Sequence, residues 1–124
     1  MTTIKKKALI LDDSVTMRSM VAMTLTRAGF DVIEAENGAH GLQQISGRQV
    51  DVIISDLNMP VMDGFDFVRA VRERPEGRGI PILMLTTEAR PEMKLKGKAA
   101  GATGWIVKPF DPTVLLKTLA RVIP

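Results

Sequence analysis

Leu9-Ile10-Leu11-Asp12-Asp13 is an apolar run that stops at two aspartates, and it decides the fold because the chain repeats the pattern. Three further apolar runs also stop at a polar side chain, namely Val52-Ile53-Ile54-Ser55 at Asp56, Ile82-Leu83-Met84-Leu85 at Thr86, and Trp105-Ile106-Val107 at Lys108. If each run is a strand of one parallel sheet, all of these stops lie at its carboxyl edge, where open α/β sheets bind ligands. The sequence therefore predicts one polar site at that edge.

Short β-branched runs alternate with helical patterns along the chain. We predict strands over residues 7–12, 31–35, 52–56, 81–86 and 104–108, and helices over 14–28, 38–46, 64–74, 91–100 and 112–122. This alternation predicts parallel strands joined by right-handed crossover helices. The fold class is therefore α/β, a (βα)5 doubly wound five-stranded parallel sheet with helices on both faces. The mixed stretch 31–35 suits an edge strand, whereas the nearly unbroken apolar runs suit strands covered on both faces.

The first and last helices carry the clearest local signals. Their apolar faces are predicted from Met17, Met20, Val21, Thr24, Leu25 and Ala28 in the first, and from Leu115, Leu119, Val122 and Ile123 in the last. Gly29 supplies a left-handed stop for the first helix, and Gly101 does the same for the fourth. Asp111 is a good N-cap and is followed by Pro112 at the first helical position.

Size and composition restrict the classes of protein to which the chain can belong. Its 124 residues, 45% of them hydrophobic, match one domain over residues 1–124, so no output domain is expected. The absence of cysteine excludes disulfides, thiolate zinc sites and thiol nucleophiles, and a cytoplasmic location is the default expectation. The start of the chain, Met1 to Lys7, is basic, but the apolar run behind it is too short for a signal peptide or a membrane span.

Charge and aromatic content argue against nucleic acid as a partner. Seventeen basic and fourteen acidic side chains leave a mild net charge of +3, spread along the chain. A nucleic-acid binder is expected to show a dense basic stripe or stacking aromatics, and here the aromatics are one tryptophan and four phenylalanines. The lone His40 lacks a second histidine or a cysteine, so we expect a surface residue rather than a metal ligand.

Three acids are expected to meet if the first and third strands are neighbours. Two carboxylates ~4 Å apart repel by about 4 kcal/mol at an effective dielectric constant near 20, so Asp12, Asp13 and Asp56 require a cation. All candidate ligands are hard oxygens, which favours Mg²⁺, with Mn²⁺ as a substitute, over zinc. Magnesium prefers few carboxylates, several waters and a phosphate, and this preference indicates phosphoryl chemistry.

The other polar stops fit that chemistry. Lys108 can pair with Asp56 at rest and with a phosphoryl oxygen later, and Thr86 supplies a hydroxyl donor. Asp56 is then the nucleophile that forms an aspartyl phosphate. Each residue also has an ordinary structural explanation, since aspartates cap helices and open turns, threonine favours strands and lysine ends them. The joint arrangement favours a site, because independent caps and turns do not require this combination.

Several motifs around these residues resemble those of a known family. The matching stretches are Leu9-Ile10-Leu11-Asp12-Asp13-Ser14, Asp56-Leu57-Asn58-Met59-Pro60-Val61-Met62-Asp63-Gly64, Leu85-Thr86-Thr87-Glu88, Ala100-Gly101-Ala102 and Lys108-Pro109-Phe110. Together they resemble the receiver domains of two-component response regulators, in particular the single-domain chemotaxis members, over essentially the whole chain. The resemblance implies a flavodoxin-like sheet with strand order 2-1-3-4-5 and a cis bond between Lys108 and Pro109.

The resemblance also implies roles for individual residues. Asp12, Asp13 and Asp56 would hold Mg²⁺ with the backbone carbonyl of Asn58, and Asp56 would take a phosphoryl group from the phosphohistidine of a sensor kinase. Thr86 and Lys108 would assist this reaction and read its result. Asn58 and Glu88 would flank the attacking water and tune dephosphorylation. The protein would then be no enzyme beyond self-phosphorylation from phosphodonors and autodephosphorylation.

One position departs from the family pattern. Trp105 stands where the family more often has tyrosine or phenylalanine as a rotating switch residue, and the indole is bulkier and lacks a hydroxyl. By the resemblance, Thr86 and Trp105 form the switch, and Trp105 fills the space that Thr86 vacates. Thr87 is larger than the alanine often found beside the switch threonine and would restrict that movement.

The expected function is a monomeric, phosphorylation-activated switch that acts on a partner protein such as a flagellar motor switch protein. We expect the fourth helix, fifth strand and fifth helix to form the partner surface, with Lys94, Lys96, Lys98 and Arg121 on polar faces. A phosphate sink or relay without a motor partner is the alternative within the same chemistry. From another class, haloacid-dehalogenase-type hydrolases place their acids as Asp-x-Asp after the first strand, whereas Asp12 and Asp13 are adjacent. A flavin carrier lacks support, since no Ser/Thr/Gly-rich phosphate loop follows the first strand.

Overall fold

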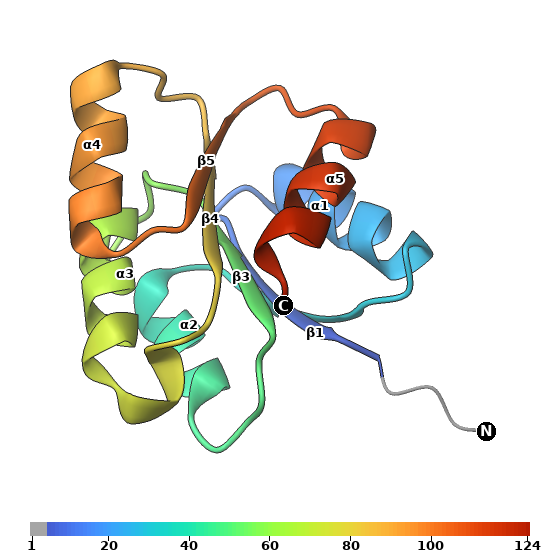
Figure 1. The fold of residues 1–124 in the computed structure, drawn as a ribbon, viewed down its shortest axis with the longest axis horizontal. Helices are drawn as coiled ribbons and strands as arrows, with labels where there is room; N and C mark the ends of the chain where they lie inside the picture. Colours follow the sequence, from blue (N-terminus) through green and yellow to red (C-terminus); the bar gives the residue numbers. More distant parts are fainter. Residues whose placement is uncertain (1–4) are drawn as a thin grey trace.

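The five predicted strands form one parallel sheet in the order β2-β1-β3-β4-β5 (Figure 1). The computed structural model describes residues 5–124, so the expectation about the basic start of the chain falls partly on residues 1–4, which lie outside the described residues. The elements are β1 (Lys7–Leu11), α1 (Val15–Arg27), β2 (Asp31–Ala35), α2 (Gly38–Ile45), β3 (Val52–Ser55), α3 (Gly64–Glu73), the 3-10 helix η1 (Pro75–Gly77), β4 (Ile82–Thr86), α4 (Pro91–Ala100), β5 (Gly104–Val107) and α5 (Pro112–Val122). The fold class and the strand order implied by the resemblance are confirmed.

The predicted element bounds differ from the observed ones by a residue at most. Three strands end one residue earlier than predicted, because Asp12, Asp56 and Lys108 lie just beyond the paired segments of β1, β3 and β5. The helix predicted over 14–28 is flanked by Ser14 as its N-cap and Ala28 as its C-cap. The short helix η1 was not predicted, because three residues are too few to show helical periodicity.

Helices cover both faces of the sheet, with α1 and α5 on one face and α2, α3 and α4 on the other (Figure 1). Alternate residues of the central strands supply the two cores, as the two-residue period of a strand requires. In β1, Leu9 and Leu11 pack into the core beneath α2 and α3, whereas Ala8 and Ile10 pack beneath α1 and α5. All four side chains are essentially inaccessible to solvent, which accounts for the unbroken apolar run.

One part of the predicted helix pattern is wrong. In α1 the buried residues are Val21 and Leu25, with Met17 and Thr24 partly buried. Of the predicted apolar face, Met20 is 51% exposed, and Ala28, which is the C-cap, is exposed as well. Residues four apart advance by only 40° around a helix, so this row forms a narrow ridge against the sheet and leaves Met20 on its flank. None of the helices in residues 5–124 combines the length and the apolar character that crossing a bilayer requires.

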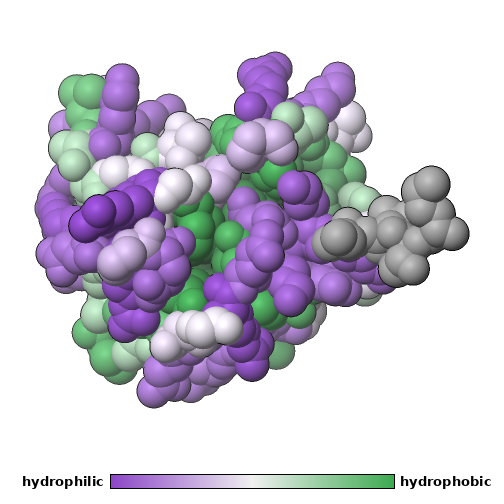
Figure 2. Space-filling model, turned by 60° about the horizontal axis from the view of Figure 1, so that its bottom comes forward, coloured by the Kyte–Doolittle hydropathy of each residue, from purple (hydrophilic) through white to green (hydrophobic). Residues whose placement is uncertain are grey.

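The turns at the helix ends follow their predicted chemistry. Gly29 and Gly101 adopt φ values of 97° and 118°, as left-handed helix stops require. The side chain of Asp111 accepts a hydrogen bond from the backbone N–H of Thr113 and so caps α5. The bond between Lys108 and Pro109 is cis, as the resemblance implies. With the lower side of Figure 1 brought forward, the surface is mainly hydrophilic, and hydrophobic residues show between the hydrophilic ones in its middle and at parts of its outline (Figure 2).

Candidate active site

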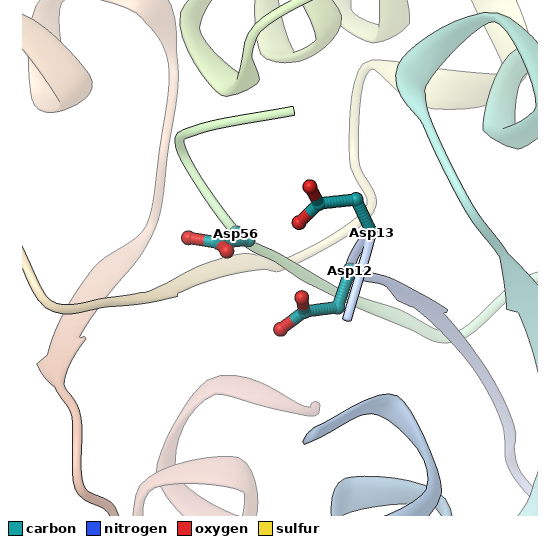
Figure 3. Close-up of side chains that lie close together, drawn as sticks. All are labelled: Asp12, Asp13 and Asp56. Carbon is teal, nitrogen blue, oxygen red and sulfur yellow. The ribbon is translucent and has the colours of Figure 1, made fainter. Parts of the chain in front are cut away.

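Three carboxylates meet at the carboxyl edge of the sheet. Asp12 and Asp13 follow β1 and Asp56 follows β3, and these two strands are hydrogen-bonded neighbours. One carboxylate oxygen from each residue lies within 4.8 Å of the others, and Figure 3 shows the three side chains gathered there. Asp12 and Asp56 are buried, whereas Asp13 is exposed. The predicted convergence of the three acids is confirmed.

Lys108 lies between the two buried acids. It follows β5, which is not adjacent to β1 or β3, yet its Nζ donates to Oδ2 of Asp12 at 2.8 Å and to Oδ2 of Asp56 at 3.2 Å. The sequence predicted the contact with Asp56 and missed the shorter one with Asp12. Burial tends to lower the pKa of Lys108, but the hydrogen bonds and negative charges of the two aspartates outweigh it and raise that pKa above its usual value. The ammonium is therefore charged.

The carboxylate oxygens and the net charge of this cluster fit a hard divalent cation. Three carboxylates and one ammonium leave a charge of minus two, which a divalent ion neutralises. Backbone amides orient the buried acids, since Oδ1 of Asp12 accepts from Ser14 N at 2.9 Å and Oδ1 of Asp56 accepts from Leu57 N at 2.7 Å. Asp13 is the acid open to solvent. Oxygen donors of this kind suit Mg²⁺ or Mn²⁺.

The local explanation that the sequence left open for Asp12 is correct in part, because Asp12 shapes the turn before α1 while Ser14 is its N-cap. Its carboxylate orders the turn into α1, where the Ser14 hydroxyl caps the helix by accepting from Met17 N at 3.2 Å. The role of Asp12 in the turn before the cap and a ligand role are compatible, because the turn uses Oδ1 and Oδ2 faces Lys108. The same carboxylate therefore serves both the start of α1 and the acidic cluster.

Thr86 ends β4, the neighbour of β3, and is fully buried. Its Oγ1 accepts a long hydrogen bond of 3.4 Å from the backbone N–H of Glu88. The Glu88 carboxylate is held by Arg90, whose Nε lies 2.7 Å away, and this hydrogen bond lowers the pKa of Glu88. Asn58, two residues beyond Asp56, is exposed. In this structure the Glu88 carboxylate is therefore hydrogen-bonded to the Arg90 guanidinium.

Trp105 contacts the same loop from β5. Its Nε1 donates to the backbone carbonyl of Glu88 at 2.8 Å, and its ring packs near Phe65 with ring centroids 6.5 Å apart. The backbone of Glu88 therefore carries one hydrogen bond to each predicted switch residue, Thr86 through its N–H and Trp105 through its carbonyl. Thr87, predicted to restrict movement of the aromatic side chain, is exposed.

Two residues at this site were not predicted. The hydroxyl of buried Ser55 donates to the backbone carbonyl of Asp56 at 2.8 Å. Arg18 donates through Nη1 to the backbone carbonyl of Asp12 at 2.7 Å and through Nε to Glu34 at 3.1 Å. A signal for Arg18 was present, because it lies four residues after the N-cap Ser14 and helical side chains point back toward the N-terminus.

Comparisons with known proteins agree with this geometry. The family described as response regulator receiver domain matches residues 8–120. "Chemotaxis protein CheY1" of Helicobacter pylori is 41% identical over 119 residues, covering 94% of this chain and 96% of that relative. The structure of Vibrio cholerae chemotaxis protein CheY4 superposes with a TM-score of 0.93 at 54% identity, covering 97% of this chain and 100% of that chain.

A structure with lower sequence identity is relevant to the three aspartates because it contains a metal ion. The receiver domain of a sensor histidine kinase from Pseudomonas aeruginosa has a magnesium ion coordinated in its active site cleft. It superposes with a TM-score of 0.89 at 25% identity, covering 96% of this chain and 98% of that chain. The sheet order, the carboxyl-edge acids and these matches along nearly the full length agree: the chain belongs to the response regulator receiver domain family and resembles the chemotaxis protein CheY.

Proposed function

We propose that this chain is a phosphorylation-activated chemotaxis response regulator that accepts a phosphoryl group on Asp56 from a histidine kinase in a magnesium-dependent reaction. The observation that carries the proposal is the acidic cluster, in which oxygens of Asp12, Asp13 and Asp56 lie within 4.8 Å and Lys108 bridges the two buried acids. Receiver domains in general respond to phosphorylation, and two of the three relatives named above are chemotaxis proteins.

The chemistry assigned to Asp56 follows from its surroundings. An oxygen of its carboxylate forms the new bond to phosphorus while the bond between phosphorus and the histidine nitrogen of the donor breaks, and the imidazole leaves with the electron pair. Bound magnesium, held by Asp12, Asp13 and Asp56 with the Asn58 carbonyl, would supply neutralisation of the phosphoryl charge. The ammonium of Lys108, already 3.2 Å from Oδ2 of Asp56, is placed to donate to a phosphoryl oxygen.

The switch proposed here runs from Thr86 through the β4–α4 loop to Trp105. Hydrogen bonds to charged groups contribute roughly 1.5 to 3 kcal/mol each, and new ones from Thr86 and Lys108 to the phosphoryl group would add their contributions. Changing a two-state population from 1:99 to 99:1 requires about 5.5 kcal/mol, which is of the same size. Rotation of Thr86 toward the phosphoryl group would weaken its bond to Glu88 N, and the carbonyl of Glu88 is held by Trp105.

The proposed output surface comprises α4, β5 and α5. A pocket of about 270 Å³ lies there, and its lining residues are Lys94, Lys98, Ala102, Thr103, Gly104 and Trp105. Lys96 is engaged elsewhere, since its Nζ lies 4.7 Å from the centre of the Phe65 ring. Arg121 is exposed near the end of α5. The two lysines that line the pocket favour a protein partner with acidic side chains, such as a flagellar motor switch protein.

We infer that catalysis is limited to self-phosphorylation and autodephosphorylation, the latter tuned by Asn58 and Glu88, and that the chain acts as a cytoplasmic monomer. The engagement of Glu88 by Arg90 bears on that tuning, because the carboxylate must leave the guanidinium to approach an attacking water.

The decisive experiment is incubation with acetyl phosphate and Mg²⁺, followed by intact mass spectrometry. One added phosphoryl group is expected, absent in Asp56→Asn and in the presence of chelator. Asp66→Asn is the matched control, because Asp66 is an exposed aspartate on α3 paired with Arg69 and should leave the modification intact. Modification of the Asp56→Asn variant to the same extent would disprove the assignment.

A second measurement addresses the output. Binding of a peptide from a flagellar motor switch protein should increase on phosphorylation and should weaken in a Lys94→Glu variant with altered charge at the pocket. Phosphorylation of the chain without any such binding would instead support the phosphate sink. Turnover of small phosphate esters would support the hydrolase.

A further inference from the structure

Arg18 joins three elements directly behind the acidic site. It is the fourth residue of α1, and its side chain is 17% exposed. It donates to the backbone carbonyl of Asp12 and to the carboxylate of Glu34, the last residue but one of β2. The guanidinium thus connects the first turn of α1, the residue after β1 and the edge strand β2.

The carbonyl that Arg18 binds belongs to the peptide between Asp12 and Asp13, where the chain leaves the sheet. The last backbone hydrogen bonds of this strand are a long one of 3.3 Å from Asp12 N to Ala35 and one of 3.0 Å that Leu11 accepts from Asp56 N. Beyond them the ladder no longer orients the backbone. The contact with Arg18, at 2.7 Å, is therefore a principal restraint on the plane of the peptide that precedes Asp13.

The orientation of that peptide determines where the Asp13 carboxylate lies. Asp12 and Asp56 are buried and held by Lys108 and backbone amides, whereas Asp13 is exposed, so packing does little to fix its side chain. A rotation of the peptide would swing the Asp13 carboxylate away from the other two acids. The placement of three carboxylate oxygens within 4.8 Å of one another therefore depends on the orientation of the peptide between Asp12 and Asp13.

We propose that Arg18 is a positioning residue for the metal site, which it serves by holding the Asp12–Asp13 peptide through its carbonyl while Glu34 holds the guanidinium. The inference rests on the proposed function, since it concerns the same magnesium site. The role requires arginine in particular, because Nε and Nη1 bind two acceptors at once in a fixed geometry. A lysine carries the same charge, but its three donors sit on one nitrogen, whereas Arg18 reaches its two acceptors through two separate nitrogens, so a lysine should hold them less well.

Four variants distinguish the hydrogen-bond geometry of Arg18 from its charge. Arg18→Gln loses both contacts and should weaken Mg²⁺ binding roughly tenfold, as removal of residues that orient metal ligands typically does. Arg18→Lys keeps the charge and should recover only part of that affinity. Glu34→Gln retains an oxygen that accepts from Nε and should stay close to wild type, whereas Glu34→Ala should weaken binding.

The measurement is a calorimetric titration of Mg²⁺ alone, without phosphodonor, at a temperature where urea denaturation shows every variant to be folded. The amide resonance of Asp13 in magnesium-free protein, which should shift in Arg18→Gln, reports the backbone change directly. Arg69→Gln on α3 is the matched control, because Arg69 also pairs with a carboxylate but lies outside the site, and it should bind Mg²⁺ as wild type does.

Wild-type affinity in Arg18→Gln, or full recovery in Arg18→Lys, would overturn the inference and leave the magnesium site itself intact. Failure of the wild-type chain to bind Mg²⁺ would instead overturn the proposed function. Weakened binding in Arg18→Gln with unchanged binding in Arg69→Gln supports the positioning role.

Discussion

Gly97, in the middle of α4, provides a sharp test of how the Trp105 indole is seated. Glycine within a helix is ordinarily less stable than alanine by roughly 0.5–1 kcal/mol, so Gly97→Ala at a free site would stabilise the protein. Here a Cβ on residue 97 would lie 2.7 Å from Cζ3 and 3.0 Å from Cε3 of Trp105. The first separation is shorter than Cβ atoms show in real structures and the second is tighter than most, so the indole would have to move.

The indole cannot move without loss. Its Nε1 donates to the carbonyl of Glu88 at 2.8 Å, a hydrogen bond that contributes about 1 kcal/mol, and its ring packs beside Phe65. Overpacking of this kind costs about 1–3 kcal/mol. Set against a helix gain of about 1 kcal/mol, Gly97→Ala should therefore destabilise the protein by up to about 2 kcal/mol.

The assay is urea denaturation followed by circular dichroism, so that the signal does not depend on tryptophan. In a Trp105→Ala background the obstruction is gone, and Gly97→Ala should then stabilise the chain by about 1 kcal/mol. The opposite signs in the two backgrounds correspond to a coupling energy of roughly 1–3 kcal/mol. Stabilisation of the wild-type background by Gly97→Ala would refute the reasoning.

Three further predictions concern strain, charge and metal. Val61 has φ 72° in a three-residue turn that is closed by a hydrogen bond of 2.8 Å from Met62 N to Pro60 O. A β-branched residue in this backbone conformation costs about 1–2 kcal/mol, so Val61→Asn should raise the urea midpoint of unfolding. An unchanged midpoint would contradict the strain. The pKa of Lys108 is raised in the folded state, so the contribution of its ion pairs to the free energy of unfolding is complete below about pH 10.5 and is lost as pH rises through the folded pKa. The wild-type protein should therefore lose more stability on alkaline titration than Lys108→Met. Equal losses would contradict the ion pairs. Mg²⁺ at about ten times its dissociation constant should raise the free energy of unfolding by about 1.4 kcal/mol. The measurement is unfolding with and without Mg²⁺, in which Asp13→Asn should show a smaller gain at the same Mg²⁺ concentration.

The local features of the fold were predictable because they depend on neighbours in the sequence. Polar residues at the ends of apolar runs located the strand ends to within one residue, and Gly29 and Asp111 located helix ends through their own backbone preferences. Parallel strands bring their carboxyl ends to one edge, so the meeting of Asp12 with Asp56 followed from the strand assignment. The exposure of Met20 was not predictable in the same way, because the width of the buried stripe depends on how α1 sits on the sheet.

The sequence alone determined the α/β class, the positions of its elements and the edge at which the acids collect, because periodicity, capping and strand polarity act over a few residues. Only the tertiary structure decided that Lys108 binds Asp12, 96 positions away in the sequence, as well as Asp56. It also decided that the Trp105 indole packs against Gly97. These contacts depend on the paths of long side chains between packed elements, and small differences in packing decide which of several nearby acceptors a donor reaches.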